Sequence, residues 1–408
     1  MCRFHEQIVA TWDNDRVSRP SKRLRLTALT FSLAMSTVTL AGCGPSQPVE
    51  TPTIDVILTG LENPRGIAFG PDGELFVAEA GTGFDAVEPT ERTGKLTVFT
   101  DHNGDGDYDD AGEAERWFSH LPTYNALQFF GTLRDEVNGP ADVLIHRDGR
   151  LFLSVDGGLD DIALYEISSE GRIGRNLYTR SNMNGIAFDR AQEHIYVAAS
   201  TANQLVEISL NGETREIVTF PALESSQQAV PAGLSVDPRT GEVLVALFSG
   251  TAVDRETGEV IPFVLGDSKV VRVDPATGAI ADEITGLTAA VDVTVDEAGN
   301  VFVVEMTSDY ADLLPKLFDV FDPEASPLHG GYLRYSGRVT FYPAAGGSSR
   351  VLAAGLDMPT NITPGPDGAL YISTGEGTPG RPIPGPDGPT AIVGEILRIT
   401  DFAVGADD

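Results

Sequence analysis

Short apolar runs separated by turns recur along the chain. The clearest is Asn63–Gly81, NPRGIAFGPDGELFVAEAG, in which an apolar run and an alternating run flank a Gly-Pro-Asp-Gly turn. Proline presets φ, aspartate bonds its own backbone and glycine accepts positive φ, so this segment predicts a β-hairpin. Five further hairpins of the same pattern are predicted at Gly139–Gly158, Asn182–Ser200, Val230–Gly250, Ala289–Ser308 and Met358–Gly377.

Two more strands follow most of these hairpins. Third strands are predicted at Lys95–Phe99, Leu205–Leu210, Val270–Val273, Arg338–Tyr342 and Ile396–Ile399. Fourth strands are predicted at Glu115–Leu121, Arg215–Phe220, Ala281–Ile284 and Arg350–Ala354. A unit of four antiparallel strands repeated six times is typical of an all-β, six-bladed β-propeller, here over residues 54–402. The last unit lacks a fourth strand, so we expect the N-terminal strand Ile54–Leu58 to close the ring there.

The apolar positions of the hairpins predict the core. Its expected members are Ile67, Phe69, Val143, Ile186, Phe188, Val293 and Ile362. Helix is expected to be nearly absent, with one turn at Asp312–Phe318.

The N-terminal segment predicts export. A basic run, Lys22–Arg25, precedes the apolar run Leu26–Leu40, which is typical of a signal peptide over residues 1–43. Leu40–Cys43 (LAGC) resembles a bacterial lipobox, which predicts a lipidated Cys43 and an extracytoplasmic lipoprotein at the outer membrane, in the periplasm or on the cell surface. Met1–Ser21 is atypical of a signal, and we expect the natural start to follow it. Residues 44–53 then form a tether and residues 403–408 an acidic tail.

Charge and cysteine content narrow the partners. The formal net charge of −32 argues against nucleic acids and anionic membrane surfaces, so we expect membrane contact only through the lipid anchor. Cys2 and Cys43 are the only cysteines, which leaves no disulfide in the mature chain. We expect a monomer with a small polar ligand.

The hairpins also carry a family resemblance. GLENPRGIAFGPDGELFVAEAGTG, QAVPAGLSVDPRTGEVLVAL and GLTAAVDVTVDEAGNVFVVEMTSD resemble successive blades of the ScyD/ScyE family, and GPDGALYISTGEGTPG resembles its last blade. The resemblance covers Ile54–Thr400 and implies a secreted, NHL-like propeller. Two features depart from it: Ala141 stands where a histidine is expected, and Asp101–Glu113 is an insertion.

That insertion, DHNGDGDYDDAGE, is dense in carboxylates. Oxygen side chains at alternate positions, with a glycine at the bend, match the first half of an EF-hand calcium loop. The glutamate expected at the twelfth position comes one residue late, at Glu113, and strands flank the loop. We predict a structural calcium site on the side of the first blade that carries its Gly-Pro-Asp-Gly turn. The alternative is a solvated acidic loop. The candidate ligands are Asp101, Asn103, Asp105, Asp107, Asp109 and Glu113.

Polar side chains also gather where first strands begin and second strands end. Aligned hairpins place these positions around one end of the channel, and the candidate ligand-binding residues are Glu79, Asp142, Asn184, Asp292, Glu305 and Asn361, with Asp156 and Glu376 close by. The set is similar to the metal centres of gluconolactonase-type propellers, which hold a divalent ion with Glu, Asn and Asp. Asp142 and Asp292 lie three blades apart, so they are not expected to share one ion. The alternative is that these residues satisfy backbone groups at strand starts.

Three functions remain open. The first is a ligand-binding propeller without established catalysis, the second a metal-dependent hydrolase of the lactonase type, and the third a quinone-dependent sugar dehydrogenase. The sequence contains no GxSxG motif, Walker loop, dinucleotide motif or zinc-type histidine spacing. Whether the protein is an enzyme is left open by the sequence.

Overall fold

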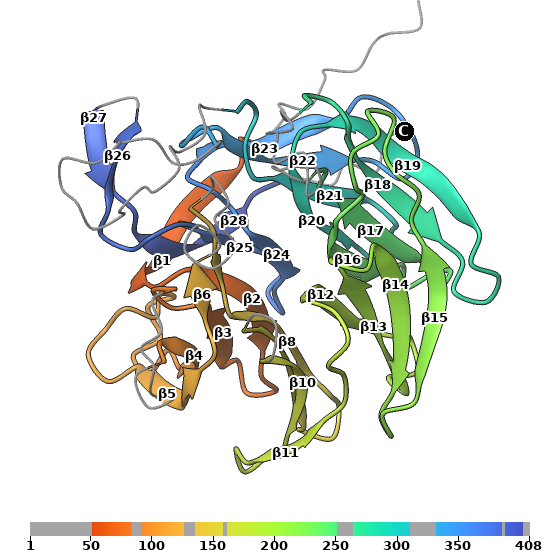
Figure 1. Ribbon diagram of the computed structural model, residues 1–408. Coiled ribbons are helices and arrows are strands. Elements are labelled where there is room, and N and C mark those ends of the chain that lie inside the picture. Colours follow the sequence, from red (N-terminus) through yellow and green to blue (C-terminus); the bar gives the residue numbers. More distant parts are fainter. Residues whose placement is uncertain are drawn as a thin grey trace, which may run out of the picture. The chain divides into compact units, whose positions relative to one another are not determined.

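Six four-stranded antiparallel sheets account for most of the regular structure (Figure 1). The computed structural model describes residues 51–83, 92–125, 135–157, 161–250, 264–310, 332–385 and 388–402. These all belong to the second of two compact units, Val49–Asp408. The predicted signal peptide, Cys43, the turn at Asp312–Phe318 and the acidic tail lie outside the described residues. All regular structure in the described residues is β-strand.

The first three blades follow the chain in order. Blade 1 contains β2 (Pro64–Phe69), β3 (Leu75–Glu79), β4 (Gly94–Phe99) and β5 (Ala114–Leu121). Blade 2 contains β8 (Pro140–Ile145), β9 (Leu151–Asp156), β10 (Ile162–Ile167) and β11 (Ile173–Asn176). Blade 3 contains β12 (Met183–Phe188), β13 (His194–Ala199), β14 (Gln204–Ser209) and β15 (Thr214–Thr219).

The other three blades complete the ring. Blade 4 contains β16 (Pro231–Val236), β17 (Val243–Leu247), β18 (Ser268–Val273) and β19 (Ile280–Leu287). Blade 5 contains β20 (Ala290–Val295), β21 (Val301–Glu305), β22 (Gly337–Tyr342) and β23 (Arg350–Leu356). Blade 6 contains β24 (Asn361–Pro364), β25 (Leu370–Thr374), β28 (Gly394–Thr400) and β1 (Thr53–Leu61). Two small hairpins, β6–β7 (Tyr124–Asn125, Val137–Asn138) and β26–β27 (Pro382–Gly385, Gly388–Ala391), stand apart.

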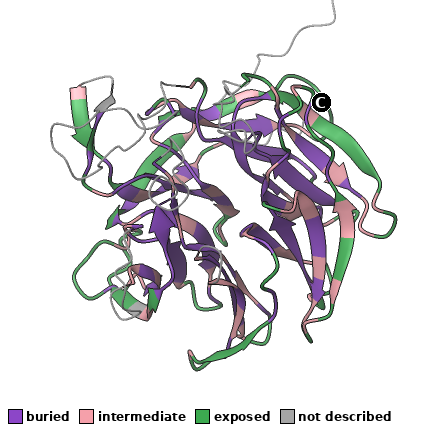
Figure 2. Ribbon diagram, in the orientation of Figure 1, coloured by how far each residue is buried: buried purple, intermediate pink, exposed green. Residues whose placement is uncertain are grey.

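The first strand of each blade lies at the centre and contacts the first strand of the next blade, from β2 round to β24 and back (Figure 1). Second strands are buried along their length, whereas outermost strands such as β11 and β19 are largely exposed (Figure 2). This arrangement confirms the predicted six-bladed β-propeller. No helix in the described part of the chain is long and apolar enough to cross a bilayer.

The N-terminal strand closes the ring as predicted. β1 pairs antiparallel with β28, from Thr53 opposite Thr400 to Leu61 opposite Gly394. A bulge between Val56 and Leu58 breaks the alternation of side chains, so the consecutive residues Ile57 and Leu58 are both 3% exposed. Both pack into the core cluster that blades 6 and 1 share. The last blade therefore consists of strands from both ends of the propeller.

The predicted core is mostly confirmed. Ile67, Val143, Ile186, Val293 and Ile362 are at most 4% exposed. Phe69 and Phe188 are only half-buried, because they lie at the turn ends of their strands and pack edge-on against Tyr371 and Phe152.

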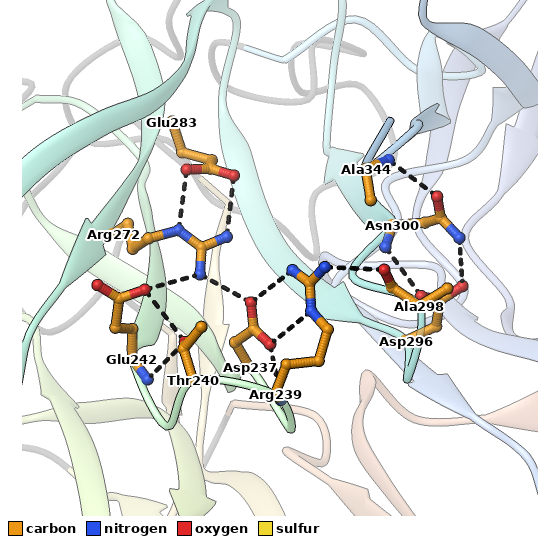
Figure 3. A network of polar contacts seen from close by, with 10 residues as sticks. All are labelled: Asp237, Arg239, Thr240, Glu242, Arg272, Glu283, Asp296, Ala298, Asn300 and Ala344. Carbon is orange, nitrogen blue, oxygen red and sulfur yellow. Dashed lines mark hydrogen bonds and ion pairs between the residues drawn. The ribbon is translucent and has the colours of Figure 1, made fainter. Parts of the chain in front are cut away.

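The hairpin turns of neighbouring blades are joined by charged side chains. In blade 4 the fully buried Asp237 accepts hydrogen bonds from Arg239 and Arg272 (Figure 3). Arg239 also donates to the carbonyl of Ala298 in blade 5 at 2.8 Å, and Arg272 forms a bidentate pair with Glu283. These arginines hold the pKa of Asp237 well below its usual range. The network fixes the two turns to each other on this face, which we call the turn face.

Candidate functional site

Two cavities lie along the central channel. The mouth cavity, of about 120 Å³, opens where first strands begin and second strands end. The funnel, of about 720 Å³, opens on the turn face and is lined by the first strands of all six blades. Asp142, Asp292 and Asn361 line both cavities, so the two meet at these residues.

One position of each first strand forms the narrow part of the channel, which we call the neck. Its residues are Gly66, Asp142, Gly185, Gly233, Asp292 and Asn361. The glycines allow neighbouring strands to approach closely: a Cβ on Gly66 would lie 2.4 Å from the Cα of Asp142, and one on Gly233 would lie 1.8 Å from Asp292 Oδ1. The two aspartates come from blades 2 and 5, which are opposite each other in the ring.

Each neck aspartate binds one backbone amide of its own strand and one of the next blade. Asp142 accepts from the amides of Val143 and Ile186, each at 2.9 Å. Asp292 accepts from the amides of Val293 and Ile362 at 2.8 and 2.9 Å. The side-chain amide of Asn361, the next neck residue, also donates to Asp292 at 2.8 Å.

Burial dominates the electrostatics of the neck. It raises the pKa of Asp142 to about 7, against the opposing effect of the two amide donors. Burial also raises the pKa of Asp292 well above its ordinary value, and the charge of Asp142 raises it further. Both shifts favour the protonated form of the carboxyl over its charged form.

One residue upstream of the neck, a second ring of residues lines the mouth cavity. Its members are Arg65, Ala141, Asn184, Ala232, Val291 and Thr360. Asn184 was predicted at this end of the channel, whereas Arg65 was not. Arg65 could have been found by reading the residue that precedes the neck residue in each hairpin, because that residue lines the mouth cavity in all six blades.

Arg65 forms part of a buried charged cluster in the mouth. It lies 3.0 Å from the carboxylate of Glu376, which is 1% exposed and also accepts the amide of Val137 at 2.8 Å. Burial raises the pKa of Glu376 to about 7, and Arg65 opposes that shift. Glu136, the next acid in the cavity wall, accepts a hydrogen bond from the buried Tyr332 hydroxyl. The segment between blades 1 and 2 therefore supplies part of the mouth.

The wall of the mouth cavity has a polar and an apolar side. On the polar side, Arg65 Nε is buried without a hydrogen-bond partner, and the side-chain amides of Asn138 and Asn184 bond to no described residue. On the apolar side, Phe248 and Met306 come from blades 4 and 5. Unused donors facing an apolar surface suit a small molecule with one hydroxylated or carbonyl edge and one carbon face.

Comparison with known proteins supplies the family. The profile of the SMP-30/gluconolactonase/LRE-like region (SGL) matches residues 49–294, more than half of the 408-residue chain. The chain belongs to this SGL family. The finer ScyD/ScyE resemblance stays a prediction. A search of curated proteins gave no match.

Solved structures with a similar fold show low identity to this SGL protein. Virginiamycin B lyase from Staphylococcus aureus is 12% identical over 86% of this chain and 99% of its own, with a TM-score of 0.46. XC5397, a gluconolactonase from Xanthomonas campestris, is 17% identical over 59% of this chain and 68% of its own, with a TM-score of 0.37. At these values neither carries an argument about activity.

Two predicted site residues lie away from the cavity. Glu79 and Glu305 are at most 1% exposed and sit inside blades 1 and 5. Glu305 accepts the amide of Thr288 at 2.8 Å and pairs with Arg338. Glu79 is arranged in the same way, with the amide of Glu62 at 2.9 Å and Lys95 at 3.2 Å. Each glutamate thus fixes the segment that leads into the first strand of its own blade. Asp156, noted as close by, bonds to Asn182 at 2.6 Å and is also outside the cavity lining.

Replacing Glu305 by glutamine is expected to lower stability and leave ligand affinity unchanged. The change keeps the side chain's size but removes the charge that binds Arg338, and a hydrogen bond to a charged group contributes about 1.5–3 kcal/mol. Thermal melts and ligand titrations of the variant measure the two effects. An unchanged melting temperature with lost ligand or metal binding would return Glu305 to the site.

A divalent centre was also expected at the mouth. Within the described residues, no group of three or more Asp, Glu, His or Cys could hold a metal ion. Asp142 and Asp292 bind backbone amides in opposite blades, while Glu376 is held by Arg65. This donor set does not fit a preformed divalent site.

The acidic loop joins β4 and β5 on the turn face, as predicted. Its oxygens bind its own backbone: Asp101 accepts from Gly104 and Gly106, and the 4%-exposed Glu113 accepts from His102. Asn103 donates to Asp105, and Asp107 accepts the amide of Asp109. Partial desolvation and the neighbouring carboxylates, Asp105 first among them, raise the pKa of Asp110. Calcium binding stays a prediction.

The loop also touches the strand that closes the ring. The amide of Tyr108 donates to the carbonyl of Ile57 at 2.9 Å, and its ring packs against the core shared by blades 6 and 1. An ion that ordered this loop would therefore stabilise the closure of the propeller.

Chelation is accordingly expected to lower the melting temperature, and Asp105→Ala to reproduce that loss. A bound ion stabilises the fold by about 2.7 kcal/mol at a hundredfold excess over its dissociation constant. Melting curves with calcium and with chelator measure this, and Asp72→Ala, in the exposed turn of blade 1, removes the same charge as a control. A melting temperature that changes with neither calcium nor chelator would contradict the calcium site and favour a solvated acidic loop.

Proposed function

We propose that this protein is a hydrolase that opens a small lactone in the mouth cavity. The observation that carries the proposal is the pair of opposed neck carboxyls, Asp142 and Asp292, beneath a cavity with unused polar donors. Membership of the SGL family supports it, because gluconolactonase is part of the family's description.

The polar and apolar walls favour a cyclic, hydroxylated ester. The free amides of Asn138 and Asn184 would bind its hydroxyl and carbonyl oxygens, while Phe248 and Met306 would cover the carbon face of the ring. Arg65 presents an unused Nε–H beside the cavity, which suits an oxygen that gains negative charge.

The two carboxyls would divide the proton transfers. A carboxylate whose pKa lies near 7 is a suitable general base, and a buried carboxyl whose pKa is raised is a suitable acid. Asp142 takes a proton from water as the water oxygen bonds to the carbonyl carbon. The ring C–O bond then breaks, and Asp292 gives its proton to the leaving alkoxide. The product is an open hydroxy acid, and one water molecule is consumed.

A ligand-binding propeller without turnover is the second candidate. The contacts of Asp142 and Asp292 with the amides of Ile186 and Ile362 favour it, since such contacts also serve to hold neighbouring blades together. Sugar oxidation has less support, because no described histidine lines the mouth cavity.

The proposal is tested by adding aldonolactones and unsubstituted lactones to the protein and measuring the acid released at constant pH. The protein is assayed both before and after dialysis against a chelator. A hydrolysis rate that saturates with substrate concentration in both cases supports the proposal. Saturable binding of the same compounds, measured by calorimetry without acid release, would overturn it in favour of the binding protein. Metal analysis of the purified protein accompanies both arms.

We also propose that Cys43 anchors the protein outside the cytoplasm. Support comes from the basic and apolar runs before Leu40–Cys43. No nucleic acid or further membrane contact is proposed, in line with the net charge of −32.

Cys43→Ser is expected to release the protein from membranes and to abolish labelling by a fatty-acid analogue. Two buried acyl chains are needed for stable anchoring, and the variant has no thiol to receive them. Fractionation of cells that express either form measures the result. A membrane fraction unchanged by the substitution would remove the lipoprotein proposal.

A further inference from the structure

The funnel gives the neck carboxyls a second exposure to solvent. It is about six times larger than the mouth cavity, at about 720 Å³ against 120 Å³, and reaches Asp142, Asp292 and Asn361 from the turn face. Among the residues that the structure describes, no charged side chain other than the two aspartates lines it. The channel can therefore be approached from two ends that differ in size and chemistry.

The funnel wall requires hydration. Each first strand is the end strand of its sheet, so the edge that faces the channel has no strand partner. Side chains bind several groups of the first strands: the neck aspartates bind the amides of Val143, Ile186, Val293 and Ile362, and Thr363 binds the carbonyl of Ile67 at 3.1 Å. Buried backbone groups are almost always paired, so the other channel-facing groups need water.

The mouth cavity leaves little room for water beside a substrate. At about 120 Å³ against about 720 Å³, the mouth cavity leaves much less space beside a bound ring than the funnel does. A hydrolase must nevertheless supply one water per turnover and return both carboxyls to their starting state.

We propose that the funnel is a solvent and proton route to Asp142 and Asp292, which stays open while a ligand fills the mouth. Its catalytic part rests on the proposed hydrolysis. After the ring opens, Asp142 carries the proton taken from water and Asp292 has lost its own. Proton exchange with solvent in the funnel returns the first to a carboxylate and the second to an acid, without waiting for the product to leave.

A reversible plug tests this route. Ser235 in β16 lines the funnel, is half-buried and forms no side-chain hydrogen bond with a described residue. The only natural cysteines are Cys2 and Cys43, so Ser235→Cys places a single thiol in the propeller. Benzyl methanethiosulfonate then attaches a benzylthio group that a reductant removes. Thr214→Cys, equally half-buried on the outermost strand β15, is the matched control.

Two readouts separate the route from the reaction. Hydrogen exchange at the amides of Ile186 and Ile362 should slow by about tenfold in the plugged Ser235→Cys protein and recover with reductant. The kcat for lactone opening should fall about tenfold while KM stays within about twofold. The labelled Thr214→Cys protein should show neither change.

Each outcome decides one part. Unchanged exchange at both neck amides would overturn the route itself. Slower exchange with unchanged kcat would overturn its catalytic part, because water and protons would then pass through the mouth. Slower exchange in a protein that opens no lactone, plugged or unplugged, would support the route and reject the proposed function.

Discussion

Replacing Ile57 by aspartate is expected to prevent stable folding of the propeller. Ile57 is 3% exposed and packs in the core that β1 brings to blades 6 and 1, so the change removes apolar contacts and buries an unpaired charge. Its cost should be about 4–5 kcal/mol or more, a large share of the stability of a typical domain. Because β1 closes the ring, the loss should spread to blade 1 as well as blade 6. Chemical denaturation followed by circular dichroism measures it.

The neighbouring residue supplies the control. Val56 lies on the same strand but is 54% exposed, so Val56→Asp adds the same charge at the surface. It should change stability by no more than about 0.5 kcal/mol. Equal effects of the two substitutions would mean that β1 contributes β-pairing alone and that the bulge at Ile57 does not define the closure.

The fold could be predicted because its unit repeats. Each hairpin carries turn residues and two short apolar runs, and six such units can bury their faces only against one another. The bulge that turns both Ile57 and Leu58 inward was not predictable in this way. It depends on the register between β1 and β28, which come from opposite ends of the propeller.

The site was predicted only as far as strand position determines it. Alignment of the hairpins correctly placed Asp142, Asn184, Asp292 and Asn361 at the mouth cavity. It does not show which way a side chain at the end of a second strand points. Glu305 lies opposite Arg338 in the register of β21 and β22, as Glu79 lies opposite Lys95. An arginine or lysine on the third strand, opposite the glutamate in the register, therefore predicts an ion pair inside the blade.

No sequence pattern predicted the residues of the mouth that lie outside the repeated hairpins. Glu136 and Asn138 belong to the segment between blades 1 and 2. That segment is fixed by the buried pair of Asp135 with Arg381, which joins it to the connection between β25 and β28 in blade 6. A contact between residues so distant in sequence cannot be deduced from one unaligned chain. The proposed catalysis therefore depends on the neck, where the aligned hairpins place Asp142 and Asp292 and the structure buries their carboxyls.

Asp142→Asn is expected to abolish most lactone hydrolysis while the propeller stays folded. A general base contributes about 10²–10⁴-fold to a rate, and asparagine cannot accept the proton of the attacking water. Its carbonyl oxygen can still accept the amide of Ile186, which is the one of the two bonds that joins blades 2 and 3. In the natural protein kcat should rise with pH through about 7, where burial places the pKa of Asp142. The variant should lose that rise.

Stability should respond to the same titration with the opposite sign. The folded-state pKa of Asp142 is raised from 3.8 to about 7, so the folded protein binds the proton more tightly than the unfolded chain does. This group therefore destabilises the fold progressively as pH rises from about 4 to about 7. The variant lacks the penalty, and the difference in unfolding free energy should shift in its favour over that interval. A variant that keeps full hydrolysis and its pH profile, but loses stability, would show that Asp142 only holds blades together and would leave the lactonase proposal without its base.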